Sequence, residues 1–297
     1  MILKIQNLWK GLNNSERPLK YFISRLFVHF PIFFKNFYFT RKNYKLSMSS
    51  SSLTVTMFEK GEKHLDFEEN LFKSIIRQND SFIDIGANIG HISISLKTHM
   101  PSIQCFAIEA NPKIFKILGD NIRLNKLDIR SINCAVGEEN NTTIKFQDSN
   151  SDDANSVISD KMLGKNNENL YIVDHKKELT VKSRTLDSLM DDFSISNNIR
   201  LIKVDTEGYE FFVLKGAKNT LKKTEMIFFE YWDRLTLKYD YTQHEIFLFL
   251  RSLDFEIYEI SENLVIKDFD IKSLKLVTHE TLFKKNQNLL AINKKLL

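Results

Sequence analysis

The seven residues from Asp84 to Gly90, Asp-Ile-Gly-Ala-Asn-Ile-Gly, place a carboxylate and two glycines directly after a short apolar run. Gly86 permits a tight turn after a strand, and Gly90 lets the start of the following helix approach a ligand closely. Glu109 ends the next apolar run about 20 residues later, where an acid can accept hydrogen bonds from both hydroxyls of a ribose. Strand, glycine loop, helix, strand and acid together predict a nucleotide-type cofactor site.

The composition of this loop distinguishes between cofactors. Ala87 and Asn88 stand where dinucleotide loops often have glycine, whereas a pyrophosphate needs bare backbone amides over a longer glycine-rich arc. Asp84 would repel a pyrophosphate but suits a ligand that carries a sulfonium or amino group. We therefore predict S-adenosylmethionine as the cofactor and keep NAD as the alternative. The predicted cofactor contacts are Asp84, Gly86, Ala87, Asn88, Gly90, Glu109, Ala110, Asn111, Asn133, Ala135 and Asp205.

A second chemistry-bearing stretch runs from Leu201 to Gly208 and contains Lys203, Asp205 and Glu207. Strand alternation places Lys203 and Asp205 on one face. Asp205 and Glu207 flank the carboxyl end of a strand, the edge at which open α/β sheets bind ligands. A carboxylate beside a lysine can take a proton from a substrate hydroxyl or hold a divalent cation that assists this step. A structural ion pair with a helix cap is the alternative interpretation.

Further candidates lie at the same predicted edge. Glu230 ends the fifth strand and adds a third acid, so these carboxylates serve either a cation or a sugar. Tyr231 and Trp232 follow it as stacking surfaces for a sugar or as core residues. Asn133 is either an adenine contact or a turn residue, and His91 is a further catalytic candidate because of its convenient pKa. Asp205, assisted by Lys203 or Glu207, is the predicted base; Glu230 and His91 complete the catalytic set.

The elements that must position these residues alternate along the chain. The spacing predicts strands at 81–85, 103–109, 129–136, 200–205 and 226–231, and helices at 90–99, 111–125, 184–192 and 208–223. Asn111 and Pro112 are typical of a helix start. A strand is predicted at 53–58 from its alternation, a helix follows from Asp66, and the polar segment 137–170 is expected to form a functional loop or hairpin. Two more strands are predicted near the end of the chain, at 255–260 and 288–293.

Composition narrows the class of protein. The chain has 297 residues, 42% of them hydrophobic, which suffices for one large core with an extension. Residues 1–46 hold nine Lys or Arg residues and one acid, Glu16, so this segment carries +8 and the remainder −4. The slightly acidic remainder makes nucleic acid an unlikely partner. Cys105 and Cys134 fall in apolar runs and are expected to be reduced, which favours a cytoplasmic setting.

The first 50 residues form a basic, aromatic extension ahead of a domain that covers 51–297. Arg25, His29, Pro31 and Lys35 interrupt its aromatic stretch, so this stretch should not span a bilayer. Two interpretations stay open: a segment that lies on an anionic membrane surface, and a helical lid or dimer element packed on the domain.

Several motifs occur in a fixed order: Asp84–Gly90, Glu109-Ala-Asn-Pro112, Asn133-Cys-Ala-Val-Gly137, Arg184-Thr-Leu-Asp187, Lys203–Gly208, Leu214–Ala217 and Asn288–Ile292. Over roughly residues 60–293 this ordered set resembles the FkbM family of S-adenosylmethionine-dependent methyltransferases. Ala110 and Thr206 replace the Pro and Val that are more usual there, and neither change removes a charged group. The resemblance implies a class I methyltransferase (Rossmann-like) fold, with seven strands in a mostly parallel sheet, helices on both faces and an N-terminal helical extension.

The resemblance also implies an O-methyltransferase, because many members methylate sugar hydroxyls of polysaccharides or natural products. The expected partner is accordingly a small molecule or glycan. The alternatives are an NAD-dependent oxidoreductase, an RNA methyltransferase that uses the basic first 46 residues, and a membrane-peripheral scaffold without turnover. A homo-oligomer is also compatible with the sequence.

Overall fold

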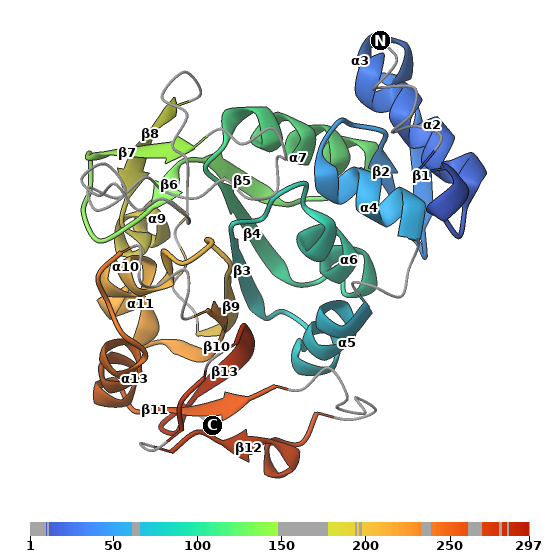
Figure 1. Cartoon of the computed structure of the whole chain (residues 1–297). Helices are drawn as coiled ribbons and strands as arrows, with labels where there is room; N and C mark the ends of the chain where they lie inside the picture. Colours follow the sequence, from blue (N-terminus) through green and yellow to red (C-terminus); the bar gives the residue numbers. More distant parts are fainter. Residues whose placement is uncertain are drawn as a thin grey trace, which may run out of the picture.

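The computed structural model describes residues 10, 12–60, 66–147, 178–193, 195, 198–232, 239–260, 269–278, 281–283 and 285–296. The described residues form a large central sheet with the strand order β12-β11-β13-β10-β9-β3-β4-β5 (Figure 1). Its strands are β3 (Ser81–Ile85), β4 (Gln104–Glu109), β5 (Arg130–Asn133), β9 (Ile199–Val204), β10 (Thr224–Tyr231), β11 (Phe255–Glu259), β12 (Lys275–Leu276) and β13 (Gln287–Asn293).

Strands β10, β9, β3, β4 and β5 are parallel, and β13 runs antiparallel between β10 and β11. The order places β3 and β9 side by side, so the first loop and the Lys203–Gly208 stretch leave the sheet at one edge. This confirms the predicted class I methyltransferase fold. Strand β12 adds two residues to the predicted seven strands at the outer edge of the sheet.

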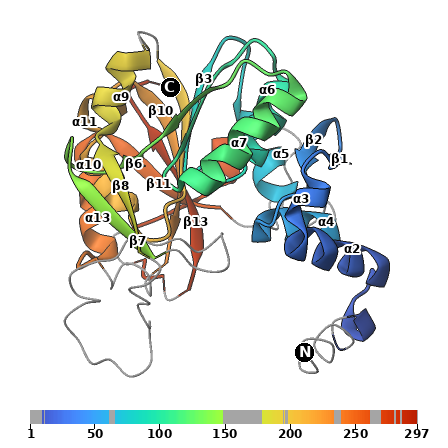
Figure 2. The ribbon, with the colours of Figure 1, turned by 90° about the horizontal axis from the view of Figure 1, so that it is seen from above.

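Helices cover both faces of the sheet, as Figure 2 shows from above. One face carries α5 (Asp66–Ile75), α6 (His91–His99) and α7 (Pro112–Asn125); the other carries α9 (Leu186–Phe193), α10 (Glu210–Lys215), α11 (Lys218–Leu221) and α13 (Gln243–Ser252). The buried apolar side chains form two clusters accordingly. Phe82 of β3 belongs to the first cluster and its neighbour Ile83 to the second, because successive side chains of a strand point to opposite faces.

Three predicted elements differ in the structure. Residues 53–58 lie in helix α4 (Ser52–Lys60), which buries Thr54, Met57 and Phe58 at helical spacing. The predicted strand 129–136 divides into β5 and β6 (Ala135–Val136), and β6 joins a smaller sheet with β8 (Glu178–Arg184) and β7 (Thr143–Gln147). The predicted helix 208–223 is two short helices, because the chain turns at Gly216 and Ala217.

Several local predictions are confirmed. The Asn111 side chain caps α7 by accepting a hydrogen bond from the Lys113 amide at 2.9 Å. Cys105 and Cys134 are both free thiols and both buried. Strand β7 lies within the predicted 137–170 excursion, whose residues 148–170 fall outside the described part of the chain. In the described part of the chain, no helix is both long and apolar enough to span a membrane.

The N-terminal extension packs against the domain. Helices α2 (Pro18–His29) and α3 (Pro31–Phe34) precede a hairpin of β1 (Tyr38–Arg41) and β2 (Tyr44–Ser47). Side chains of α7 accept hydrogen bonds from the backbone of β2, Asn121 from the Ser47 amide at 2.8 Å and Asn125 from the Lys45 amide at 2.7 Å. Leu46 is fully buried in the first apolar cluster. The predicted domain division after residue 50 stays a prediction. The residues before it and the residues after it are in contact.

Candidate active site

The first loop turns sharply because three of its residues have a left-handed backbone. Gly86, Asn88 and Gly90 have φ angles of 75°, 50° and 84°. The amides of Gly86 and Ala87 both donate to the carbonyl oxygen of Ile108 at 3.0 Å, which fixes the loop to the end of β4. A Cβ on Gly90 would stand 2.3 Å from a Leu118 methyl group of α7, so the glycine lets this helix pack against the loop.

The same loop touches the end of β9. The Asp205 amide donates to the Ile85 carbonyl at 3.0 Å, and a Cβ on Gly86 would stand 1.9 Å from the Asp205 carbonyl oxygen. No side chain therefore fits at Gly86 without moving one of the two backbones. This contact joins the two motifs that the sequence analysis singled out.

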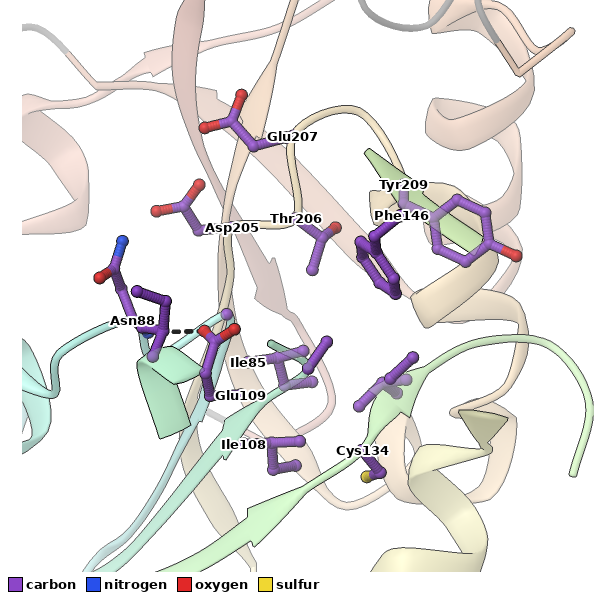
Figure 3. Close-up of a pocket in the computed structure, with 15 residues that line it drawn as sticks. Ile85, Asn88, Ile108, Glu109, Cys134, Phe146, Asp205, Thr206, Glu207 and Tyr209 are labelled. Atoms are coloured by element: carbon purple, nitrogen blue, oxygen red, sulfur yellow. Dashed lines mark hydrogen bonds between the residues drawn. The ribbon is translucent and has the colours of Figure 1, made fainter. Parts of the chain in front are cut away.

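Glu109 faces the loop from the end of β4. Its two carboxylate oxygens accept hydrogen bonds from two backbone amides, that of Asn111 at 2.8 Å and that of Asn88 at 2.9 Å, the latter drawn as a dashed line in Figure 3. Burial raises its pKa to about 7, although these two amides act in the opposite direction. Each oxygen keeps a further lone pair, so the oriented carboxylate can accept two more hydrogen bonds from a ligand.

These elements enclose a cavity of about 710 Å³, including the part open to solvent. One wall of the cavity is polar and the other is mostly apolar (Figure 3). The polar wall is formed by Gly86, Asn88, Glu109, Asp205, Thr206 and Glu207. The remaining lining is Ile85, Ile108, Ala110, Ile114, Cys134, Ala135, Val136, Phe146 and Tyr209. A largely apolar cavity with a few convergent polar groups is typical of a small-molecule site.

A buried ion-pair cluster lies beneath the polar wall. The Lys203 ammonium is 3.6 Å from the Asp84 carboxylate and 3.0 Å from that of Asp205. Asp84 also accepts a hydrogen bond from the Ser93 hydroxyl at 2.7 Å. Burial raises the pKa of Asp84, while the Lys203 charge opposes that rise. Burial alone would lower the pKa of Lys203, but the charges of Asp205 and Asp84 raise it above its ordinary value, so Lys203 stays protonated.

Asp205 connects this cluster to the cavity. Its side chain is 42% exposed, whereas Lys203 and Asp84 are almost completely buried. The lysine therefore holds one end of a carboxylate whose other end is open to a ligand. Such a carboxylate is held in one orientation, as a general base requires.

The charges of this cluster also affect the pKa values of two further acids, Glu68 and Glu230. Burial raises the pKa of Glu68 on α5 to about 7; the Lys203 charge acts against this, and the charges of Asp205 and Glu230 reinforce it. Burial and the Asp205 charge likewise raise the pKa of Glu230, which accepts a hydrogen bond from the Asn286 amide group at 2.6 Å. The edge of the sheet therefore carries more carboxyl groups than Lys203 pairs with.

A short turn after β9 presents Thr206 and Glu207 to the cavity. Glu207 and Gly208 have φ angles of 57° and 98°. The buried Glu210 carboxylate accepts hydrogen bonds from the amides of Thr206 at 2.9 Å and Gly208 at 3.2 Å, and from the Thr206 hydroxyl at 3.1 Å. Glu210 thus holds the turn that carries Asp205 and Glu207 into the lining.

His91, at the start of α6, is buried rather than exposed to the cavity. Burial lowers its pKa to about 4, so the imidazole is neutral near pH 7. Neither ring nitrogen has a hydrogen-bond partner within the described residues. A catalytic role for His91 therefore stays a prediction.

The structure places the predicted residues in two groups. The cavity lining includes Gly86, Asn88, Glu109, Ala110, Ala135, Asp205 and Glu207. Outside the lining lie Asp84, Ala87, Gly90, His91, Asn111, Asn133, Lys203 and Glu230. Asn133 bonds the Glu109 and Ala110 carbonyls at 2.8 Å each, and therefore supports the end of β4. Tyr231 is buried in the core and offers no stacking surface.

Sequence reasoning missed Glu68, Glu210, Phe146 and Tyr209. Glu68 was visible only as part of a helix start, and Glu210 only as a residue of a predicted helix. Phe146 belongs to the smaller sheet, whose position over the cavity no motif indicates. Among the described residues, no group of three or more His, Cys, Asp or Glu side chains is arranged to hold a metal ion.

The lining fits S-adenosylmethionine. Glu109 offers oriented acceptors for ribose hydroxyls, and Gly86 adds bare backbone to the lining where it packs against the Asp205 backbone. Apolar side chains such as Ile108 and Phe146 provide surfaces for a purine ring. Asp84 supports the loop from beneath and is not accessible to a ligand in the cavity.

Comparison with known sequences gives a family match. The Methyltransferase FkbM domain matches residues 84–257, which is more than half of the chain. A protein named Methyltransferase 1 from Beauveria bassiana (strain ARSEF 2860) is 24% identical over 163 residues. The match covers 52% of this chain and 61% of that relative, so the chain spans less than two thirds of its length.

Solved structures show more distant likenesses. M. capricolum TrmK, in complex with S-adenosyl-homocysteine, is 14% identical with a TM-score of 0.40, over 77% of this chain and 69% of that chain. A putative rRNA-methylase from Clostridium thermocellum is 8% identical with a TM-score of 0.43, over 78% of this chain and 96% of that chain.

Proposed function

Because this chain belongs to the FkbM methyltransferase family, we propose that it transfers the methyl group of S-adenosylmethionine to a hydroxyl oxygen of a sugar or glycan. One observation carries the proposal: a single cavity joins the Gly86–Asn88 backbone and Glu109 to the partly exposed carboxylate of Asp205. A cofactor-type site and a candidate proton acceptor thereby share one space.

The first part of the proposal concerns the cofactor. When bound, S-adenosylmethionine supplies an electrophilic methyl group. Glu109 would accept hydrogen bonds from the ribose hydroxyls, because the Asn88 and Asn111 amides already orient its carboxylate. The apolar lining at Ile108, Ala135 and Phe146 would exclude water from the adenine ring of the cofactor.

The second part concerns the acceptor. A hydroxyl oxygen becomes a better nucleophile as it loses its proton, and a positioned base contributes about 10²–10⁴-fold to rate. Asp205 has the required exposure, and Lys203 holds its carboxylate at 3.0 Å in one orientation. Glu207 lies in the same lining and would bind a neighbouring hydroxyl of the acceptor. Carboxylates are common partners of sugar hydroxyls because each oxygen accepts two hydrogen bonds.

Binding of S-adenosylhomocysteine tests the cofactor directly. We expect calorimetry to show saturable binding, and Glu109→Gln to weaken it at least about tenfold through loss of charged hydrogen bonds. Glu139→Gln, an exposed acid outside the lining, is the control and should bind normally. Binding of NAD in place of S-adenosylhomocysteine would instead support an oxidoreductase.

Asp205→Asn tests the base. We expect normal cofactor binding and a loss of turnover of about 10²–10⁴-fold, measured as methyl transfer to a glycan extract. Asp191→Asn, an exposed acid of α9, should retain full activity. Full turnover in Asp205→Asn would refute this assignment. Methylation of RNA but not of glycan would refute the proposed glycan acceptor. A wild-type protein that binds cofactor but is inactive would indicate a scaffold.

A further inference from the structure

The N-terminal extension exposes most of the large apolar side chains found on the surface. Ten such side chains are exposed in the described part of the chain, and seven of them lie between residues 19 and 38. These seven, here called the N-terminal patch, are Leu19, Phe22, Phe30, Ile32, Phe33, Phe37 and Tyr38. Ile32 and Phe33 are 86% and 75% exposed. Such a concentration of exposed apolar groups on one segment indicates an interaction surface.

The patch lies on the outward side of helices that are anchored by their inward side. Helix α2 buries Ser24 and Phe27 toward α4, where the Phe27 and Phe58 rings stack edge to face with centroids 5.7 Å apart. Leu19 and Phe22, three residues apart and therefore on one side of the helix, remain exposed. Figures 1 and 2 show α2 and α3 at a corner of the molecule, far from the central sheet (Figure 1, Figure 2).

Aromatic contacts and the neighbouring hairpin hold this corner in place. The Phe34 ring lies 6.1 Å from that of Phe27 and 5.6 Å from that of Phe37, so α3 is packed on α2. The hairpin that follows is bonded to α7 through Asn121 and Asn125. The patch is thus presented in one arrangement before it meets a partner, which lowers the entropic cost of binding.

The charge around the patch is mainly positive. Arg17 and Lys35 lie next to patch residues along the chain, and Glu16 is the one acid among residues 12–45. Lys45 lies over the Tyr38 ring at 4.7 Å, which places a cation directly at the edge of the patch. Arg25, by contrast, is paired with Glu59, and Arg41 with Glu69. Apolar side chains flanked by basic ones complement a surface that is anionic above and apolar below.

We propose that the N-terminal patch binds an anionic lipid bilayer, with the aromatic and aliphatic side chains inserted among the headgroups and the basic side chains against lipid phosphates and carboxylates. Aromatic rings favour this interfacial depth, and each nearby Lys or Arg adds attraction to anionic lipid. A second copy of this chain fits the N-terminal patch less well as a partner. In a two-fold dimer the same patch would face itself, so like charges would oppose one another.

Vesicle sedimentation with the full chain tests the proposal independently of activity. We expect binding to phosphatidylcholine vesicles that contain phosphatidylserine, weaker binding without phosphatidylserine, and release by added salt. The double variant Ile32→Ser, Phe33→Ser should lower the partition coefficient at least about tenfold through lost apolar burial. Its control is Leu282→Ser, an equally exposed apolar residue outside the patch, which should bind as the wild type does.

Charge variants separate the two contributions. Arg17→Gln and Lys35→Gln should each weaken binding about fivefold, whereas Lys218→Gln on α11 should have no effect. Circular dichroism of each variant checks that the fold is intact. Three outcomes would overturn the proposal: no vesicle binding by the wild type, equal binding with and without phosphatidylserine, or self-association that Ile32→Ser, Phe33→Ser abolishes while vesicle binding is absent.

Discussion

The Cα of Gly86 faces the carbonyl oxygen of Asp205 so closely that a Cβ there would stand 1.9 Å from that oxygen. This contact joins the first loop, which borders the cofactor side of the cavity, to the residue that we propose as the base. The spacing between donor and acceptor sides of the cavity therefore depends on two backbones that touch. A side chain at Gly86 would separate them.

Replacement of Gly86 tests this contact. Gly86→Ala should lower the free energy of unfolding by about 2–5 kcal/mol, because the methyl group collides with backbone and the φ of 75° strains any residue with a Cβ. S-adenosylhomocysteine binding should weaken in parallel. Gly119→Ala on α7 is the control: its Cβ would meet only the flexible end of Arg123, at 3.4 Å. That variant should gain about 0.5–1 kcal/mol in urea unfolding. Equal effects of the two substitutions would show that the backbone contact at Gly86 does not exclude a side chain.

Lys203 is the counter-charge of the buried Asp84 and of the partly exposed Asp205. Lys203→Met should destabilise the fold by about 3–5 kcal/mol, because the nearly fully buried Asp84 loses its neutralising partner. A second substitution, Asp84→Asn, should restore part of this loss by removing the unpaired charge. Urea unfolding of both single variants and the double variant measures this coupling. Additive effects would show that the two side chains do not interact.

Glu68 should shape the pH dependence of turnover. With a pKa near 7, it acquires its negative charge as the pH rises through neutrality. A negative charge at this edge of the sheet favours transfer of the acceptor's proton toward it, so wild-type turnover should rise through this range. In Glu68→Gln the rise should disappear while S-adenosylhomocysteine affinity stays unchanged, since Glu68 lies outside the lining. Glu139→Gln serves as the control, and a wild-type profile retained in Glu68→Gln would contradict this role.

Glu69 should contribute to stability in a defined pH range. Burial alone would raise its pKa, but the Tyr44 hydroxyl at 2.7 Å and the charges of Arg41 and Lys42 lower it to about 2. Because the folded-state pKa lies below the ordinary value of 4.5, its contribution is complete above pH 4.5 and disappears as the pH falls toward 2. Its size is about 3 kcal/mol.

Urea unfolding at stepped pH measures this contribution. The stability difference between wild type and Glu69→Gln should shrink as the pH falls from 4.5 to 2. The exposed acid Glu16 provides the control, since Glu16→Gln should follow the wild-type curve. A difference that stays constant over this range would show that Glu69 is not ionised through these contacts.

The order of elements and the residues at their ends were accessible to sequence reasoning because they follow local rules. Alternation predicted that Lys203 and Asp205 share a face, and their charged groups are 3.0 Å apart. The acid at the end of the second strand, Glu109, does line the cavity. The segment 53–58 was misread because alternation over six residues also accommodates a helix, and the burial of Thr54, Met57 and Phe58 decides for the helix.

The amino-acid sequence by itself determined the family, the fold class and the two motifs that meet at the sheet edge, since glycines and acids at fixed spacing are properties of the chain. Only the tertiary structure decided which of these side chains reach the cavity. Asp84, Lys203 and His91 became buried because helices and strands distant in sequence close over them. Glu68 came near Asp205 for the same reason, and the apolar patch at residues 19–38 stayed exposed because nothing in the described chain covers it. Burial depends on all neighbours at once, so no local pattern could report it.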